Sequence, residues 1–224
     1  MSNVKNRIFV DFDGTVIDIK NKCYEIYKNA CFKFGLRIFC KDIYWKYRRK
    51  SYSEKEIILK RNKNSLKIDQ YLSFRLKCLE SKQYLDFDKL IINKNKISKI
   101  KRCFDLYLIT LRKNKKNLLW EINKMNIKEL FKEVICSSSR KRQGDFDRKK
   151  ALLNKFSPFL PTDILIGDTE MDYLLGEKLK IQTLIVESGI YDQELFLKKY
   201  PNMSHILYRN INNIFVNLIK FYKL

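Results

Sequence analysis

The feature that most constrains the 224-residue chain is the segment Ile8–Thr15, where a hydrophobic run ends in Asp-Phe-Asp-Gly-Thr. The run is β-branched and aromatic, which is typical of a buried parallel strand. The acids then leave the sheet at its carboxyl edge, where open α/β sheets bind their ligands. Side chains at i and i+2 point the same way, so Asp11 and Asp13 can converge on one site.

Two converging carboxylates repel each other unless a cation or a proton relieves them. The pair therefore predicts a hard cation such as Mg²⁺, with one acid free for nucleophilic or acid–base work. A simpler interpretation is a strand that ends in a turn, since Asp-Gly is a common turn dipeptide. The rest of the chain has to decide between the two.

Composition favours a globular protein and excludes several chemistries. The chain is 45% hydrophobic and 13% aromatic, enough for a sizeable core. It contains no apolar stretch near the ~20 residues of a membrane span and no apolar signal region before the first predicted strand. We therefore expect a soluble, cytoplasmic protein with no membrane partner. The cysteines are scattered, which favours reduced thiols over a zinc site or disulfides, and His205, the single histidine, has no Gly-x-Ser-x-Gly partner motif.

The net charge of +22 is typical of proteins that bind nucleic acid. The excess lysine, however, is spread along the chain with abundant Asn, Ile and Tyr, as an AT-rich coding sequence also produces. Two basic clusters stand out, Trp45–Lys50 and Arg140–Arg142. Interleaved aromatics and cations could stack bases and hold phosphates. For the first cluster, a solvated helix face with its aromatics in the core is the favoured interpretation.

The segment from about Lys20 to Ile92 is predicted to be helical. It has no convincing alternating strand and no Pro, and its apolar residues recur at helical spacing. The signals are a helix over Cys23–Phe34 with Gly35 as C-cap, a capping box at Ser53 and Glu56, and an amphipathic pattern over Leu66–Leu79.

Strand and helix alternate again after this block, which predicts a parallel, three-layer sheet with right-handed crossovers. The fold class is therefore α/β, with a Rossmann-like core from residues 1–18 and 93–224 and an all-helical insertion at 19–92. The predicted strands are Leu106–Ile109, Val134–Cys136, Ile164–Ile166 and Thr183–Val186, and the predicted helices are Asn117–Met125, Lys149–Phe156 and Met171–Leu179.

Polar residues mark two of the following elements. Thr110 ends a predicted strand, with Arg112 just beyond; its hydroxyl can donate to a phosphate oxygen or cap a helix. Lys149 and Lys150 lie at a predicted helix start. A cation is electrostatically disfavoured there, so one of them is expected to counter an anion.

The segment Gly167–Asp172 supplies two further acids. A strand delivers Asp168 to the sheet edge, and Asp172 follows one helical turn later. Acid, hydroxyl, cation and acid thus follow one another at successive strand ends or helix starts.

This ordered set resembles the motifs of the haloacid dehalogenase-like (HAD) hydrolase superfamily, over nearly the whole chain. The helical block lies where that family inserts its C1-type cap. The matches are Asp11–Thr15 to Asp-x-Asp-Gly-Thr, Thr110 to the Thr or Ser that ends a strand, Lys149 (or Lys150) to the lysine motif, and Gly167, Asp168 and Asp172 to Gly-Asp-x-x-x-Asp.

The resemblance implies phosphoryl transfer. Dehalogenases and phosphonate hydrolases of the superfamily lack the second aspartate, whereas its phosphatases and phosphomutases keep it. By resemblance, Asp11 would attack phosphorus and form an aspartyl-phosphate, and Asp13 would protonate the leaving alcohol and then activate water.

The resemblance also implies a ligand set. Mg²⁺ would be held by Asp11, the backbone carbonyl of Asp13, and Asp168, with Asp172 as a ligand or in support of one. Phosphate would be bound by Thr110, Arg112 and Lys149, with Gly14 bringing a backbone N–H near it.

Within the superfamily, the region from Gly167 to Tyr191 is most similar to the phosphoglycolate phosphatase-like branch, with Val186–Gly189 as its strand and Ser-Gly turn. The Thr and His pair of the phosphoglucomutase branch is not evident after Asp18. The leading hypothesis is a Mg²⁺-dependent phosphatase that acts on a small phosphorylated metabolite. The alternatives are a nucleotide or polynucleotide-end phosphatase that uses the basic cap, and a non-catalytic protein that kept the fold.

Overall fold

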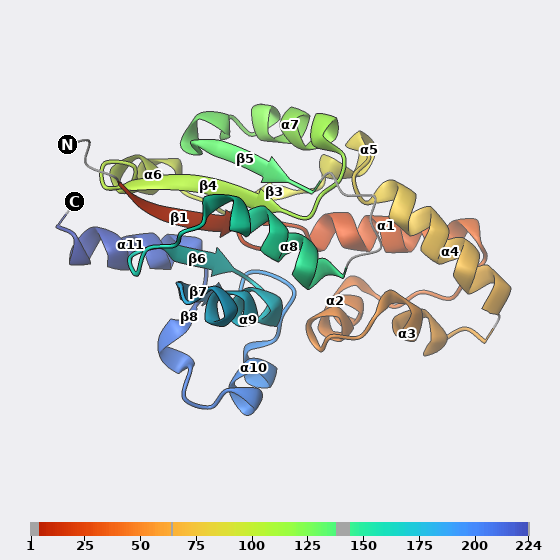
Figure 1. Ribbon diagram of the computed structural model, residues 1–224. Helices are drawn as coiled ribbons and strands as arrows, with labels where there is room; N and C mark the ends of the chain where they lie inside the picture. Colours follow the sequence, from red (N-terminus) through yellow and green to blue (C-terminus); the bar gives the residue numbers. More distant parts are fainter. Residues whose placement is uncertain (1–4, 64, 138–143, 224) are drawn as a thin grey trace.

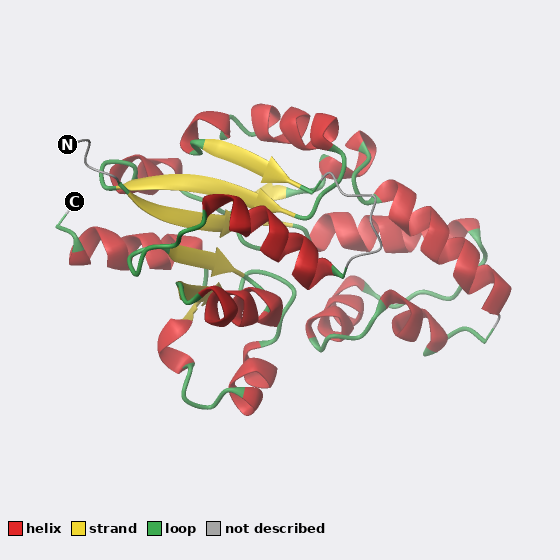
Figure 2. Ribbon diagram, viewed as in Figure 1, coloured by secondary structure: helices red, strands yellow, loops and turns green. Residues whose placement is uncertain are grey.

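A six-stranded parallel sheet lies at the centre of the computed structural model, which describes residues 5–63, 65–137 and 144–223 (Figures 1 and 2). The strand order is β5-β4-β1-β6-β7-β8. The strands are β1 (Asn6–Asp11), β4 (Phe104–Thr110), β5 (Glu133–Cys136), β6 (Ile164–Gly167), β7 (Gln182–Val186) and β8 (Leu207–Tyr208).

The order of the strands reverses direction at β1. The chain runs outward from β1 through β4 to β5, then returns to the other side of β1 and runs outward again through β6, β7 and β8. Val10 of β1 lies in register with Leu108 on one side and Ile166 on the other. Ligands of open α/β sheets bind at such a switch point, outside the carboxyl ends of the strands. That position is occupied here by Asp11.

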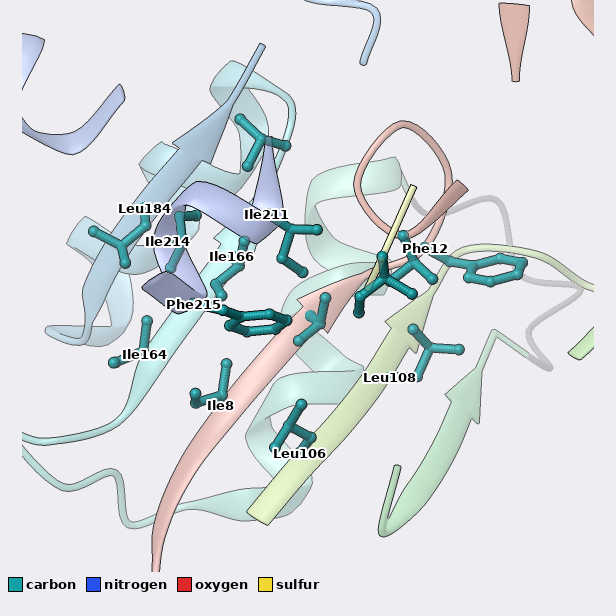
Figure 3. Close-up of a cluster of buried hydrophobic side chains, with 14 of the residues drawn as sticks. Ile8, Phe12, Leu106, Leu108, Ile164, Ile166, Leu184, Ile211, Ile214 and Phe215 are labelled. Carbon is teal, nitrogen blue, oxygen red and sulfur yellow. The ribbon is translucent and has the colours of Figure 1, made fainter. Parts of the chain in front are cut away.

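Helices cover both faces of the sheet. Successive side chains of each buried strand point to opposite faces, so both faces carry apolar side chains that have to be covered. Ile8 and Val10 pack into one hydrophobic cluster, which Figure 3 shows, and Phe9 packs into the other. The first cluster includes residues of α6 (Lys94–Ile100), α7 (Lys115–Lys124) and α11 (Ile211–Phe221), and the second includes residues of α8 (Asp145–Leu153) and α9 (Glu170–Leu179). The predicted three-layer α/β core is confirmed.

The segment between β1 and β4 contributes helices that form a third, separate hydrophobic cluster, at one end of the molecule in Figure 1. We refer to its helices as the cap. Its largest fully buried side chains are tyrosines, and Tyr27 stacks on Tyr44 with ring centroids 4.4 Å apart. The cap helices are α1 (Lys20–Lys33), α2 (Lys41–Arg49), α3 (Glu54–Leu59), α4 (Ser65–Cys78) and α5 (Lys82–Leu85).

The predicted insertion is helical except for one short strand. β2 (Ile17–Asp18) pairs antiparallel with β3 (Lys89–Leu90), so the chain enters and leaves the cap through two adjacent segments. Our boundaries of residues 18/19 and 92/93 between core and cap stay a prediction. None of the described helices is long and apolar enough to cross a membrane.

Local signals fixed several helix ends as expected. Gly35 follows α1 with a positive φ of 61°, and Ser53 and Glu56 form the predicted capping box of α3. The prediction for α8 was wrong at its start: the helix begins at Asp145, so Lys149 lies in the second turn. Acids in the first turn, Asp145 and Asp147, explain the earlier start because they complement the helix dipole. Four elements were not predicted from the sequence: α6, β8, α10 (Gln193–Lys199) and α11.

A buried ion pair joins the starts of β1 and β6, at the edge of the sheet opposite Asp11. Arg7 Nε donates to Asp163 Oδ1 at 3.0 Å, and Arg7 Nη1 donates to the carbonyl of Phe156 at 2.7 Å. The side chain of Asp163 is 0% exposed. If one member of such a pair is removed, the other is left as a buried charge without a partner, which strongly destabilises the folded protein.

We therefore expect Asp163→Ala to lower the free energy of unfolding by about 3–5 kcal/mol in urea denaturation. The matched control is Asp86→Ala, which breaks a pair with Lys124 whose side chains are 50% and 53% exposed. Exposed pairs contribute about 0–1 kcal/mol. Equal losses in the two variants would contradict a structural role for the Arg7–Asp163 pair.

Candidate active site

A cavity of about 300 Å³ opens at the carboxyl end of β1, between the core and the cap. The residues that we predicted from separate motifs meet there. Those that line the cavity are Asp11, Asp13, Thr110, Arg112, Lys149 and Asp168. Gly14 packs against Asp168, and Asp172 lies beside Lys149, so both residues adjoin the cavity lining.

Lys149 connects the acids of two motifs. Its Nζ donates to Asp11 Oδ1 at 2.7 Å and lies 2.5 Å from Asp172 Oδ1. Lys149 is buried, whereas Lys150 is half-buried and has no ion pair or hydrogen bond from its side chain within the described ranges. The structure thus places Lys149, of the two candidates, in the cavity. Lys149 counters the carboxylates of Asp11 and Asp172. It reaches them from the second turn of α8 and not from the start of the helix.

Two glycines allow the acids of the fourth motif to pack closely. A Cβ on Gly167 would lie 2.2 Å from Asp172 Cγ, and one on Gly14 would lie 2.4 Å from Asp168 Oδ2. Gly14 also has a φ of +83°, which other residues rarely adopt. Asp172 Oδ2 accepts from the hydroxyl of Thr169 at 2.7 Å, which caps α9 and fixes the carboxylate. Both motifs therefore require glycine at these positions, because a side chain there would clash with Asp168 or Asp172.

The carboxylates of Asp11, Asp168 and Asp172 form a buried group that suits a metal ion. Each offers one oxygen, and these oxygens lie within 4.8 Å of one another. Burial raises the pKa of Asp11 to about 7, which Lys149 opposes only in part. Burial, together with the charges of Asp11 and Asp172, holds the pKa of Asp168 well above its usual range. Three acids around one lysine favour a further positive charge, and a hard divalent cation with oxygen ligands, such as Mg²⁺, fits.

The side chain of Asp13 faces cations of the protein instead of this group. Arg112 binds it in a bidentate way, with Nε 2.8 Å from Oδ2 and Nη2 2.7 Å from Oδ1, and Lys22 Nζ lies 3.3 Å from Oδ1. Burial alone would raise the pKa of Asp13, but Arg112 and Lys22 outweigh it and hold the pKa well below its usual range. The two acids of Asp-Phe-Asp thus occupy opposite electrostatic environments. Metal binding through the backbone carbonyl of Asp13 stays a prediction.

The cations that bind Asp13 belong to a larger buried network. Lys22 lies 2.6 Å from Asp88 Oδ2, and Arg112 contacts both Asp88, at 3.3 Å, and Glu121. Asp88 Oδ1 and Glu121 Oε1 are buried, and neither accepts a hydrogen bond from an N–H or a hydroxyl of the described part of the chain. Burial raises the pKa of Glu121 to about 8 and also raises the pKa of Asp88. The physical account is a shared proton, with the Glu121 carboxyl donating to Asp88.

Sequence reasoning missed Lys22, Asp88 and Glu121. They come from the start of the cap, its end, and the middle of α7, so no local motif unites them. One signal was available for Glu121, which lies on the buried face of α7 beside Leu118 and Ile122. A glutamate on an apolar stripe has to find a partner inside the protein.

The remaining predicted features lie as follows. In the first basic cluster Trp45 is buried, Tyr47 packs half-buried against the interior of the cap, and Lys46 and Lys50 are exposed, as expected for a helix face, whereas Arg48 and Arg49 are half-buried. Arg140–Arg142 lies outside the described residues. His205 is an exposed residue of a short helical turn, and the cysteines are free thiols.

Comparison with known proteins identifies the fold. No protein-family model matches the chain, and a search of curated proteins found no relative. Solved structures do match: a haloacid dehalogenase-like family hydrolase from Streptococcus pneumoniae has a TM-score of 0.74 at 16% identity, covering 99% of this chain and 100% of that one. A "predicted phosphatase" from Clostridium acetobutylicum has a TM-score of 0.72 at 16% identity, covering 97% of this chain and 100% of that one.

A third match, a "predicted phosphoglycolate phosphatase" from Haemophilus somnus, has a TM-score of 0.68 at 13% identity and covers 97% of this chain and 98% of that one. All three cover the cap as well as the core. The chain therefore has the fold of HAD-like hydrolases, as its motifs predicted, including the inserted helices.

The shared proton of Glu121 gives a stability prediction. The pKa of Glu121 in the folded state, about 8, lies above its ordinary value of 4.5, so the folded protein holds an extra proton between these pH values. The wild type therefore loses stability as the pH rises through this window. Glutamine mimics the protonated carboxyl, since its amide donates to Asp88 and its oxygen accepts from Arg112. We expect Glu121→Gln to gain stability relative to the wild type from about pH 5 to about pH 9, by about 1 kcal/mol or more.

Urea denaturation at both pH values measures this difference. Glu129→Gln, which changes an exposed glutamate, is the control and should show no such trend. A constant difference between Glu121→Gln and the wild type would mean that Glu121 is ionised throughout.

Proposed function

We propose that the protein is a Mg²⁺-dependent phosphatase that hydrolyses a small phosphorylated metabolite through an aspartyl-phosphate on Asp11. The observation that carries the proposal is the buried carboxylate of Asp11 at the switch point of an HAD-like sheet, bound to Lys149 and facing a cavity that Thr110 and Asp168 also line. The hydrolase and phosphatases with the same fold support this class of reaction.

In the first step Asp11 attacks phosphorus and the ester P–O bond breaks. Lys149, 2.7 Å from Asp11, favours the ionised carboxylate and a charged phosphoryl group beside it. The hydroxyl of Thr110, buried at the end of β4, is available to a phosphate oxygen. Asp13 gives a proton to the leaving alkoxide.

In the second step Asp13 takes a proton from water, and the oxygen of that water attacks the phosphorus of the aspartyl-phosphate. Phosphate leaves and Asp11 is restored. Asp13 needs a proton before the first step, although Arg112 and Lys22 hold it ionised in the free protein. A phosphate dianion competes for both cations, so substrate binding weakens their hold on Asp13 and lets it become protonated.

The metal would be held by Asp11, Asp168 and Asp172, together with the predicted backbone carbonyl of Asp13. When bound, Mg²⁺ neutralises charge on the phosphoryl oxygens and on Asp11.

Cavity size and the cap arginines favour a small substrate. About 300 Å³ is at the lower end of the volumes of ligand pockets. Arg48 and Arg49, on which the polynucleotide alternative depends, are half-buried: Arg48 lies beside Glu54, and Arg49 donates to the carbonyl of Tyr191 at 3.3 Å. The acids and the lysine that the chemistry requires are all present, which disfavours a non-catalytic protein.

We expect Asp11→Asn to lower the turnover of p-nitrophenyl phosphate with Mg²⁺ by at least about 1,000-fold, since no nucleophilic carboxylate remains. Chelation with EDTA should abolish the activity of the wild type, and added Mg²⁺ should restore it. The control Asp69→Asn changes an exposed aspartate of the cap and should leave turnover intact. Full activity in Asp11→Asn, or none in the wild type with Mg²⁺, would refute the proposal.

A further inference from the structure

Two arginines of the cap form the wall of the cavity that faces the catalytic acids. Arg48 comes from α2 and Arg75 from α4, and both line the cavity. A single carboxylate, that of Glu54 at the start of α3, holds them both. Arg75 Nε lies 3.0 Å and Arg48 Nε 3.4 Å from Glu54 Oε1. Helices from three parts of the cap are thus joined at this wall.

Glu54 is already well supplied with donors. It is buried, Tyr44 Oη donates to Oε1 at 2.7 Å, and Tyr71 Oη donates to Oε2 at 2.6 Å. One carboxylate with two tyrosine donors needs at most one cation to balance its charge. The second guanidinium is therefore in excess and leaves a net positive charge on the wall. A buried cation without an anion is costly, so the excess charge calls for a partner from outside the protein.

The outer ends of these guanidinium groups are free to bind that partner. Both Nε atoms lie near Glu54 Oε1 and are buried, but neither donates a hydrogen bond to an acceptor within the described residues. Arg75 Nη1 and Nη2 donate to no atom of the described residues. Within the same residues, the Nη atoms of Arg48 make one hydrogen bond, from Nη1 to the carbonyl of Tyr52 at 3.3 Å. The Nη atoms of the two arginines that make no hydrogen bond are not fully buried, so they are accessible to a ligand. Since both residues line the cavity, these N–H groups are available to a ligand there.

We propose that Arg48 and Arg75 bind a second anionic group of the substrate, a carboxylate or a second phosphate. This inference rests on the proposed function. The substrate class is then a small phosphomonoester with an oxyanion at its other end. Paired guanidinium groups suit carboxylate and phosphate because their planar N–H donors match two oxygens at once. Between the two ends, Cys23 and Leu79 give the cavity apolar lining that suits a short carbon spacer.

The test compares kcat/KM, with Mg²⁺ present, for three substrates of similar size. They are 3-phosphoglycerate, propane-1,3-diyl bisphosphate and glycerol 3-phosphate, which carries no second anion. We expect one or both of the first two to exceed glycerol 3-phosphate by about 10- to 100-fold, the usual range for charge-assisted hydrogen bonds. Which of them is preferred distinguishes a carboxylate from a phosphate.

Arg75→Gln should bring that ratio close to one, and Arg75→Lys should restore part of it. The control Lys77→Gln removes the same charge from an exposed position of the same helix and should keep the ratio of the wild type. Wild-type turnover without preference would overturn the inference but not the proposed function. An equal loss on all three substrates in Arg75→Gln, with a lower Tm, would show that the arginine pair is only structural.

A binding measurement tests the anion site without turnover. By calorimetry, 3-phosphonopropionate should bind the wild type at least about 10-fold more tightly than propylphosphonate, and Arg75→Gln should remove most of this difference. If the wild type hydrolyses no phosphomonoester but retains this preference, the proposed function fails and the anion site stands. Equal affinities for the two phosphonates would exclude a carboxylate as the second anionic group, and together with no preference for the bisphosphate substrate they would overturn the anion site.

Discussion

The burial of several carboxylates at one edge of the sheet is the constraint on which the site depends. Each ionised carboxylate taken out of water costs several kcal/mol unless a charge or hydrogen bonds offset it. Lys149 offsets two of them at once, from the second turn of α8. Its position requires α8 to pack against β4 and α9, and the glycines at positions 14 and 167 leave the acids room to approach. That one ammonium group thus links the end of β1, which carries Asp11, to α9, which carries Asp172.

The second charge network ties the cap to the core through Asp13, just after the end of β1. Lys22 at the start of the cap and Asp88 at its end both belong to it, and Arg112 extends it to Asp13. Glu80 adds a separate link, because its carboxylate accepts from the backbone N–H of Asn114 at 2.6 Å, just before α7. The environment of Asp13 thus depends on residues of both parts of the chain. A change in the position of the cap would change that environment.

Sequence alone located Asp11, Thr110 and Asp168 because each lies where a strand ends, and such ends carry local signals. Lys149 lies inside α8, so the helix start that singled out Lys149 and Lys150 was misplaced, and only the family motif favoured Lys149. The sequence also predicted the alternation of strands and helices, since buried strands such as Leu106–Ile109 are short and apolar. It missed Lys22, Asp88 and Glu121, whose meeting depends on how the cap folds back along β2 and β3. It did not predict that Arg48 and Arg75 share Glu54, because residues 48, 54 and 75 have no common periodicity. Long-range packing, not propensity, decides such contacts.

The pKa shifts of Asp11 and Asp13 in the free protein are opposite to those that their proposed roles require. Asp11, the proposed nucleophile, has a pKa raised to about 7, and Asp13, the proposed proton donor, has a lowered pKa. Acid and base roles are normally assigned where environments separate two pKa values in the useful direction. On the proposed mechanism the direction would reverse when both ligands are bound: a cation held by Asp168 and Asp172 would favour the ionised form of Asp11, and a phosphate that competes for Arg112 and Lys22 would let Asp13 take up a proton. The site would then be suited to attack on phosphorus only in the complete complex. Such a dependence would favour a substrate that engages both the core and the cap.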